Sequence, residues 1–179
     1  GALRGARGNS GVILSQLFRG FARSVAGLQD ADAAQVAQAL KSGAETAYKA
    51  VMKPKEGTIL TVARVIAETA ILRAQSAPAD MEGLFATVLS SGEAILAKTQ
   101  DMLPILKQAG VVDAGGRGLM LIYTGMNAAL RGEVIETVTM SEDGAASFED
   151  DHDAIAELKY IYCTEFLIDR IRPDATEDD

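Results

Sequence analysis

Cysteine, histidine and tryptophan are almost missing from this chain of 179 residues, which contains one Cys, one His and no Trp. A single Cys excludes an internal disulfide and is typical of a reducing compartment. No apolar run is long enough to span a bilayer, and no signal-peptide pattern opens the chain. We therefore expect a cytoplasmic protein without a transmembrane segment.

Aromatic residues make up only 5% of the chain, whereas hydrophobic residues make up 48%. The core must then be built from Ala, Leu, Val and Ile, a composition that suits closely packed helices. The formal net charge is −8. Because an acidic chain repels a phosphate backbone, we expect no nucleic-acid partner.

A glycine-rich stretch opens the chain, with Gly5, Gly8 and Gly11 at three-residue spacing before an apolar segment of helical periodicity. The first turn of a helix offers unpaired N–H groups and a partial positive charge to an anion. Glycine lets the backbone approach that anion, and Asn9 or Ser10 suits the N-cap. The stretch predicts a phosphate-binding loop. The alternative is an ordinary turn, since the stretch matches neither G-x-x-x-x-G-K-[ST] nor G-x-G-x-x-G.

Apolar residues at helical spacing predict an all-α antiparallel bundle or barrel over the first 132 residues. Asp32 and Asp80 suit N-caps, and Gly125, in mid-helix, requires close contact with a neighbouring helix. Met102, Met120 and Met126 are interpreted as core residues. The expected helices are Ser10–Ser24, Ala33–Met52, one opening at Thr58, one following Asp80, a short segment Asp101–Ala109, and Gly118–Leu130.

Two further helices are predicted to start after glycine, one at Gly57-Thr58 and one after the glycine-rich stretch from Val111 to Gly118. In an up-and-down bundle alternate loops fall at the same end, so three helix starts could converge on one polyanion. Basic residues near two of these loops could add positive potential there; they are Arg4, Arg7, Lys53 and Lys55. The alternative is three capped turns with ordinary surface charges.

The composition changes after Gly132. Residues 134–140 and 160–168 have strand-like patterns, and the acidic residues 141–153 are typical of a linker. We expect a helical domain over 1–132, a linker over 133–157, and the start of a following domain over 158–179. This is a short β-containing C-terminal extension, and both ends of the chain suggest a fragment of a longer protein.

Three segments in this order, residues 5–16, 47–62 and 110–116, resemble the nucleotide-binding domain of bacterial fatty acid kinase catalytic subunits. These subunits belong to the dihydroxyacetone kinase L-type (Dak phosphatase-like) family. The resemblance spans Gly1 to about Leu130, and Tyr162–Leu167 is similar to the first strand of the next domain.

The resemblance implies an all-helical barrel that holds ATP or ADP and magnesium at one end. It places the first loop at the phosphates, Thr58 close by, and the loop after Val112 at the adenine and ribose. The implied cofactor-binding residues are Gly8, Asn9, Ser10, Gly11, Thr58, Asp113, Gly115 and Gly116.

The resemblance also implies the reaction, which is phosphorylation of a fatty acid carboxylate to an acyl phosphate. The acid would be carried by a DegV-like binding protein, and the full-length enzyme would be a homodimer. The family's magnesium-holding carboxylates lie upstream of the first glycine loop and match nothing in this chain, so we expect no metal ligands and no catalytic residues here. The fragment alone should be inactive and bind nucleotide weakly or not at all.

Two alternative functions are a dihydroxyacetone-kinase-type subunit and a helical interaction module without a nucleotide site. Two single residues could also be metal ligands. His152 lies in an acidic segment that we interpret as solvated. Cys163 is a candidate ligand only for a metal site completed outside this chain.

Overall fold

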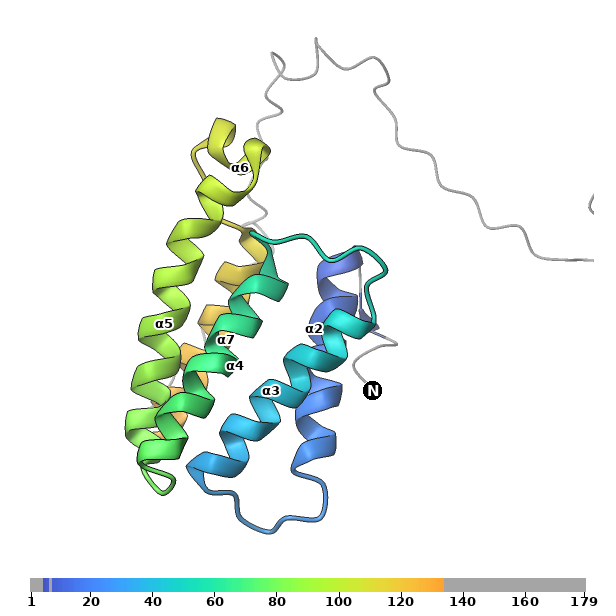
Figure 1. Ribbon diagram of the computed structural model, residues 1–179. Coiled ribbons are helices and arrows are strands. Elements are labelled where there is room, and N and C mark those ends of the chain that lie inside the picture. Colours follow the sequence, from blue (N-terminus) through green and yellow to red (C-terminus); the bar gives the residue numbers. More distant parts are fainter. Residues whose placement is uncertain (1–4, 7, 134–179) are drawn as a thin grey trace, which may run out of the picture. The chain divides into compact units, whose positions relative to one another are not determined.

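Six α-helices follow one another in the part of the chain that the computed structural model describes, residues 5–6 and 8–133. Successive long helices run in opposite directions and form an antiparallel bundle, as Figure 1 shows. This confirms the expected all-α bundle for these residues. The predicted strands and linker lie outside the described residues. The helices are α2 (Gly8–Ser24), α3 (Ala33–Lys49), α4 (Ile59–Ser76), α5 (Met81–Met102), α6 (Pro104–Ala109) and α7 (Ala114–Leu130).

Side-chain caps begin the helices where the sequence predicts them. Asp32 and Gln35 form a reciprocal capping box at α3, with each side chain bonded to the other's backbone N–H. The Asp80 carboxylate accepts a hydrogen bond of 2.8 Å from the Gly83 N–H at α5. These bonds satisfy N–H groups that would otherwise be unpaired.

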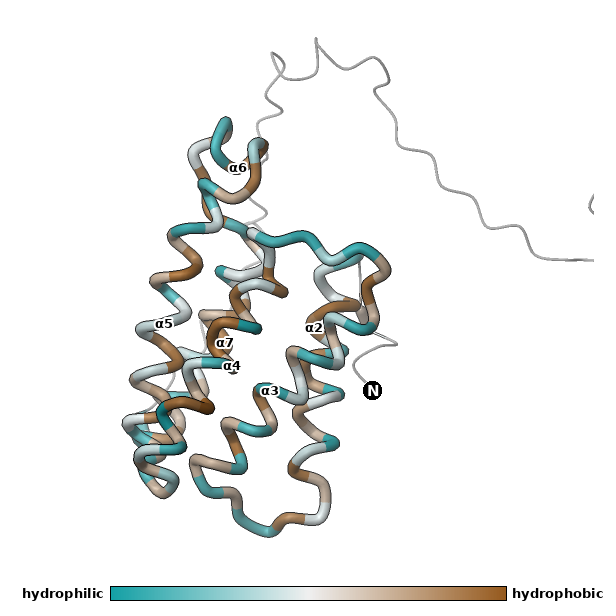
Figure 2. The backbone as a smooth tube through the Cα atoms, viewed as in Figure 1, coloured by the Kyte–Doolittle hydropathy of each residue, from teal (hydrophilic) through white to brown (hydrophobic). Residues whose placement is uncertain are grey.

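The core lies between the inward faces of α3, α4, α5 and α7. Figure 2 shows hydrophobic and hydrophilic positions alternating along each helix, as helices with one buried face require. The largest fully buried apolar side chains are Leu60, Ile66, Leu84, Met120, Val62 and Val88. Burying one such side chain contributes about 1.5–3 kcal/mol.

Helices α2 and α3 cross at a pair of glycines that the sequence analysis did not single out. A Cβ on Gly20 would lie 2.5 Å from the Thr46 Oγ1 and 2.7 Å from the Gly43 Cα, and a Cβ on Gly43 would lie 2.7 Å from the Leu17 carbonyl oxygen. The Ser42 hydroxyl donates to the Gly20 carbonyl across the same crossing. The absence of side chains at these two positions is what lets the backbones approach.

Four helix boundaries differ from the prediction. The short segment expected from Asp101 begins only at Pro104, as α6, because Asp101 and Met102 belong to α5. Helix α3 ends at Lys49 instead of Met52, because Pro54 lacks an N–H and restricts the residue before it. Helix α7 begins at Ala114 instead of Gly118, because Asp113 caps it. Helix α2 begins at Gly8, so Asn9 and Ser10 lie in its first turn and the expected N-cap at either residue is wrong.

Two packing expectations are also wrong. A Cβ on Gly125 would have no atom within 4 Å, so this mid-helix glycine does not serve a close helix contact. Met120 is buried in the core as expected, but Met102 and Met126 are 41% and 36% exposed. Both therefore lie at the edge of the core, and apolar spacing alone does not distinguish an edge position from a core position.

Candidate functional site

The starts of α2, α4 and α7 lie at one end of the bundle, as expected from the alternation of helix directions. Figure 1 shows all three starting at the end that carries α6. Each helix start carries first-turn N–H groups and the positive end of a helix dipole. Among the described residues this end therefore has the right elements for binding an anion.

The start of α4 is held by hydroxyl groups. The Thr58 hydroxyl donates to the Lys55 carbonyl at 2.8 Å and accepts from the Leu60 N–H at 3.4 Å. Thr61 is 1% exposed, and its hydroxyl accepts a 2.8 Å hydrogen bond from the Gly57 N–H. Gly57 has φ +86°, a conformation that L side chains rarely adopt. Thr58 is thus confirmed as the N-cap, with its single hydrogen already donated to the turn.

The start of α7 is held by Asp113 and by a buried threonine of α5. The Asp113 carboxylate accepts a 2.6 Å hydrogen bond from the Gly116 N–H, and the Asp113 N–H donates to the Thr99 hydroxyl at 3.0 Å. Thr99 is fully buried and donates to the Leu96 carbonyl. Sequence reasoning missed Thr99. The sequence does contain a signal for Thr99, because it is a polar residue on the helix face that carries the apolar residues Val88 and Leu96.

The starts of α4 and α7 are in direct contact. A Cβ on Gly115 would lie 3.3 Å from the Ile59 Cβ, and a Cβ on Gly116 would lie 2.9 Å from the Val62 Cγ2. Both glycines therefore have a packing role, in which they let the first turn of α7 lie against the first turn of α4. Thr58 and the Asp113–Gly116 segment are brought together as the sequence analysis expected.

The start of α2 lies at the same end, with Gly8, Asn9 and Ser10 all exposed. Gly8 has φ +63°, and a Cβ on it would have no atom within 4 Å. A Cβ on Gly11 would meet Ala6 at 3.5 Å, an ordinary contact. The backbone here is open to a ligand, unlike that of Gly116.

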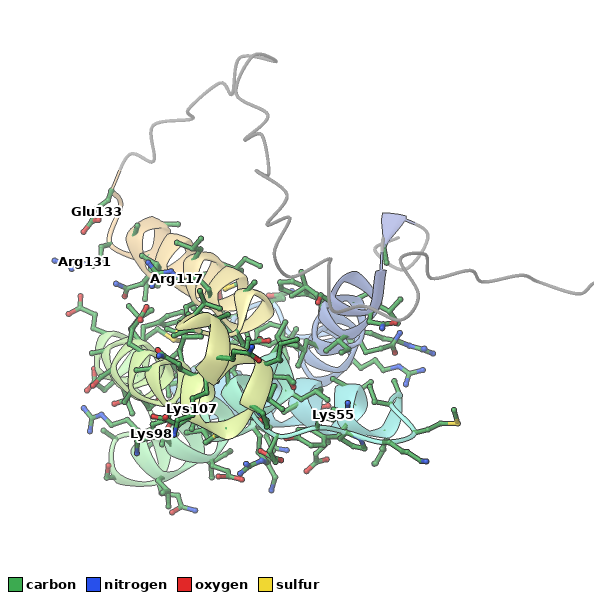
Figure 3. All side chains as sticks on the ribbon, turned by 90° about the horizontal axis from the view of Figure 1, so that it is seen from above. Lys55, Lys98, Lys107, Arg117, Arg131 and Glu133 are labelled. Atoms are coloured by element: carbon green, nitrogen blue, oxygen red, sulfur yellow. The ribbon has the colours of Figure 1, made fainter. Side chains whose placement is uncertain are left out.

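The charge of the bundle differs from that of the chain as a whole. Acidic and basic side chains are nearly balanced in residues 8–133, and the acidic excess of the chain lies in residues 134–179. Lys53 and Lys55 are exposed on the turn before α4, and Figure 3, which looks onto this end, labels Lys55 there. Arg4 and Arg7 lie outside the described residues. The balance of the bundle is compatible with an anionic ligand.

Magnesium fits this end less well than phosphate does. Nowhere in residues 8–133 do three His, Cys, Asp or Glu side chains gather as metal ligands would. Two carboxylates lie at these helix starts, Asp113, whose Oδ2 atom caps α7, and Glu56, which accepts a hydrogen bond from Thr61 in the first turn of α4. Mg²⁺ requires several hard oxygen ligands. His152 and Cys163, the other candidate ligands, lie outside the described residues.

A polar network beside α4 was also missed by the sequence analysis. The Glu56 carboxylate accepts hydrogen bonds from Thr61 at 2.8 Å, from Arg64 at 2.9 Å and from the Tyr48 hydroxyl at 3.1 Å. Burial raises the pKa of Glu56, but these three hydrogen bonds and the Arg64 charge outweigh burial and hold the pKa below its usual value. Burial, partly offset by the Arg64 hydrogen bond, raises the pKa of Tyr48.

Two hollows lie away from the helix starts. A groove of about 460 Å³ between α3 and α4 has an apolar floor that includes Ala44 and Ile71 and is bordered by Tyr48 and Arg64. A small cavity between α2, α3 and α7 is lined in part by Tyr123, whose pKa burial raises to about 12. Neither hollow contains a site residue predicted from the sequence.

Comparison with known proteins gives a consistent family. A family model described as the DAK2 domain matches residues 1–128. The chain is 44% identical over 175 residues to Protein YloV of Bacillus subtilis, covering 94% of this chain and 32% of that protein. It is 46% identical over 173 residues to an uncharacterized protein of Staphylococcus saprophyticus, covering 94% of this chain and 31% of that one. The chain thus spans about one third of the length of these relatives. No helix among the described residues is long and apolar enough to cross a membrane.

Proposed function

Because the chain belongs to the DAK2 domain family, whose domains are dihydroxyacetone-kinase-like, we propose that its helical bundle is the ATP-binding part of a phosphotransferase. The observation that supports this is the gathering of the starts of α2, α4 and α7 at one end of the bundle. Phosphoryl transfer depends mainly on positioning and on stabilising negative charge. First-turn N–H groups at helix starts supply both to a polyphosphate.

We assign the α2 start, Gly8 to Gly11, to the phosphates, because Gly8, Asn9 and Ser10 are exposed and no other helix packs against Gly8 or Gly11. The α4 start at Thr58 lies at the same end of the bundle, and we assign its backbone N–H groups to the phosphates too, since the hydroxyl hydrogen is donated to Lys55. The Asp113–Gly116 segment lies toward the adenine and ribose. Gly115 and Gly116 can contact the nucleotide only through their backbone atoms, and their Cα atoms pack against α4.

Magnesium would be held by carboxylates outside the described residues, where it would neutralise charge on the nucleotide phosphates. The described bundle contributes orientation of the nucleotide and neutralisation of its charge. We therefore expect the 179-residue chain alone to bind nucleotide weakly and to transfer no phosphate.

We propose that the acceptor is the carboxylate of a fatty acid carried by a DegV-like protein and that the full-length enzyme is a cytoplasmic homodimer. The Tyr162–Leu167 pattern favours this reading over a dihydroxyacetone kinase subunit, which would end after the helical domain. The length of the relatives, about three times that of this chain, agrees with further domains. A turnover assay with a fatty-acid-loaded carrier and with dihydroxyacetone as competing acceptors decides between the two.

The test of the nucleotide site is binding of Mg-ADP, measured by calorimetry and thermal shift. It uses the chain alone and the chain joined to the residues that precede it in the longer proteins. We expect clear stabilisation of the longer chain and little of the shorter. No binding by the longer chain would favour a helical interaction module instead.

The Gly11→Ala variant tests whether the phosphates bind at the start of α2. The added methyl fits the fold, since it meets Ala6 at 3.5 Å, but it lies where the backbone would approach a phosphate. Gly125→Ala is the matched control, as another helical glycine with open space around it. We expect Gly11→Ala alone to weaken Mg-ADP binding, by about tenfold, the size of one charge-assisted hydrogen bond. Gly8 is less suitable, because any side chain at φ +63° adds backbone strain.

A further inference from the structure

Side chains of α5 and α4 contact the turn before α4. Its last glycine, Gly57, is buried with φ +86°, and a Cβ there would lie 2.7 Å from the Met102 Cβ. The Gly57 N–H donates to the Thr61 hydroxyl at 2.8 Å. This bond joins the turn to the first turn of α4, and it lies one residue from Thr58.

The Thr61 hydroxyl takes part in two hydrogen bonds, and the Glu56 carboxylate orients it for both. A hydroxyl has one hydrogen to donate, and its oxygen can also accept. The Thr61 hydroxyl donates its hydrogen to the Glu56 Oε2 atom at 2.8 Å, which leaves its oxygen free to accept from the Gly57 N–H. An ionised carboxylate only accepts, so Glu56 fixes this direction.

Glu56 is in turn held by two other donors. Arg64 donates from Nη2 to the Oε2 atom at 2.9 Å, and the Tyr48 hydroxyl donates to the Oε1 atom at 3.1 Å. Arg64 also donates from Nε to the Tyr48 hydroxyl at 3.3 Å. The carboxylate is therefore bonded on both oxygens, from the end of α3 and from the second turn of α4.

We propose that Glu56 is a positioning residue for the proposed nucleotide site. Acting through the Thr61 hydroxyl, it fixes the Gly57-Thr58 turn so that the first N–H groups of α4 point toward the bound phosphates. This inference rests on the proposed function. It adds to that function a residue that does not touch the nucleotide and whose loss loosens one of the three helix starts.

The chain offers a matched control for Glu56. Arg64 also donates from Nη1 to the Glu68 carboxylate at 3.2 Å, and Glu68 is as exposed as Glu56, at 59% and 56% of the side chain. Glu68 lies one turn further along α4 than Arg64 and makes no hydrogen bond to the turn. Glu56→Ala and Glu68→Ala thus each remove one carboxylate partner of Arg64, but only the first frees Thr61.

Two readouts test the proposal on the longer chain used for Mg-ADP binding. Amide hydrogen exchange of Gly57, followed by NMR, reports the turn itself, and calorimetry with Mg-ADP reports the site. We expect Glu56→Ala to speed Gly57 exchange by about tenfold and to weaken Mg-ADP binding by about fivefold, in line with a hydrogen bond's net value. Thr61→Val should do the same, whereas Thr61→Ser and Glu68→Ala should match the native chain. Circular dichroism checks that each variant keeps its helices.

Each of the other possible outcomes would contradict one part of the proposal. Unchanged Gly57 exchange in Glu56→Ala would show that Glu56 does not hold the turn. Faster exchange with unchanged Mg-ADP affinity would reduce Glu56 to a stabilising residue and end its positioning role. If the native longer chain binds no Mg-ADP, the proposed function fails, and Gly57 exchange still decides whether Glu56 holds the turn.

Discussion

Gly20 and Gly125 are both helical glycines, yet replacing each with alanine should change stability in opposite directions. In a helix interior alanine is favoured over glycine by about 1 kcal/mol, because glycine loses more backbone entropy on folding. At Gly125 nothing opposes this gain, since a Cβ there would have no atom within 4 Å. Gly125→Ala should therefore stabilise the bundle by about 0.5–1 kcal/mol.

At Gly20 the same methyl group overlaps its neighbours. It would lie 2.5 Å from the Thr46 Oγ1 and 2.7 Å from the Gly43 Cα, and closer still to the Ser42 carbonyl oxygen. Two of these three atoms are backbone, so relief requires α2 and α3 to separate. Overpacking of this kind costs about 1–3 kcal/mol. We expect a cost near the upper value, because backbone atoms cannot move aside as a flexible side chain can. When the preference for alanine over glycine in a helix is subtracted from this cost, Gly20→Ala should destabilise the bundle by about 2 kcal/mol.

Urea unfolding and thermal melting of the two variants measure this difference. For a domain of this size 1 kcal/mol corresponds to roughly 3–5 °C, so Gly20→Ala should melt about 8 °C below the native chain and Gly125→Ala about 4 °C above it. Gly43→Ala should resemble Gly20→Ala, because its methyl would lie 2.7 Å from the Leu17 carbonyl oxygen. A Gly20→Ala variant as stable as the native chain would refute the close crossing of α2 and α3.

The remaining predictions concern the start of α7 and the Glu56 network. Asp113→Ala should cost about 1–2 kcal/mol in urea unfolding, because the Gly116 N–H loses its 2.6 Å acceptor, and Asp113→Asn should restore most of it. Thr99→Val should cost about 1–3 kcal/mol, because the Asp113 N–H is left unpaired, while Thr99→Ser should behave like the native chain. Since the folded-state pKa of Glu56 is depressed, its stabilisation is present above the unfolded value and lost as the pH falls through the folded one. The stability gap between the native chain and Glu56→Gln should thus narrow from pH 7 to about pH 3, and a gap that stays constant would contradict this.

Sequence patterns predicted the number, order and direction of the helices because apolar periodicity and capping residues are local signals. Asp32 and Asp80 are examples, since each cap is decided within four residues. The boundaries of α3 and α7 were less predictable. Gly115 and Gly116 weaken the helical signal, but the Asp113 cap and the packing of α7 against Ile59 and Val62 support a helix through them.

The polar network around Glu56 could not be predicted from local sequence patterns, for a different reason. Tyr48, Glu56 and Arg64 are eight residues apart from one to the next, and a helix end and a turn separate the first two. No spacing rule connects such positions. Their meeting depends on how α3 and α4 pack, as does the contact between Gly20 and Gly43.

The predicted glycines at the candidate site divide into two kinds once their surroundings are known. Gly116 has side chains against it on the side where a Cβ would lie, and Gly115 has Ile59 there, so a helix contact already accounts for glycine at both positions. Gly8 and Gly11 have no such helix contact, and their backbone is open. Packing cannot explain glycine at Gly11, where alanine would fit and would favour the helix. A ligand that approaches the backbone of α2 is the explanation that we propose for Gly11, which makes the start of α2 the most informative part of the site to test.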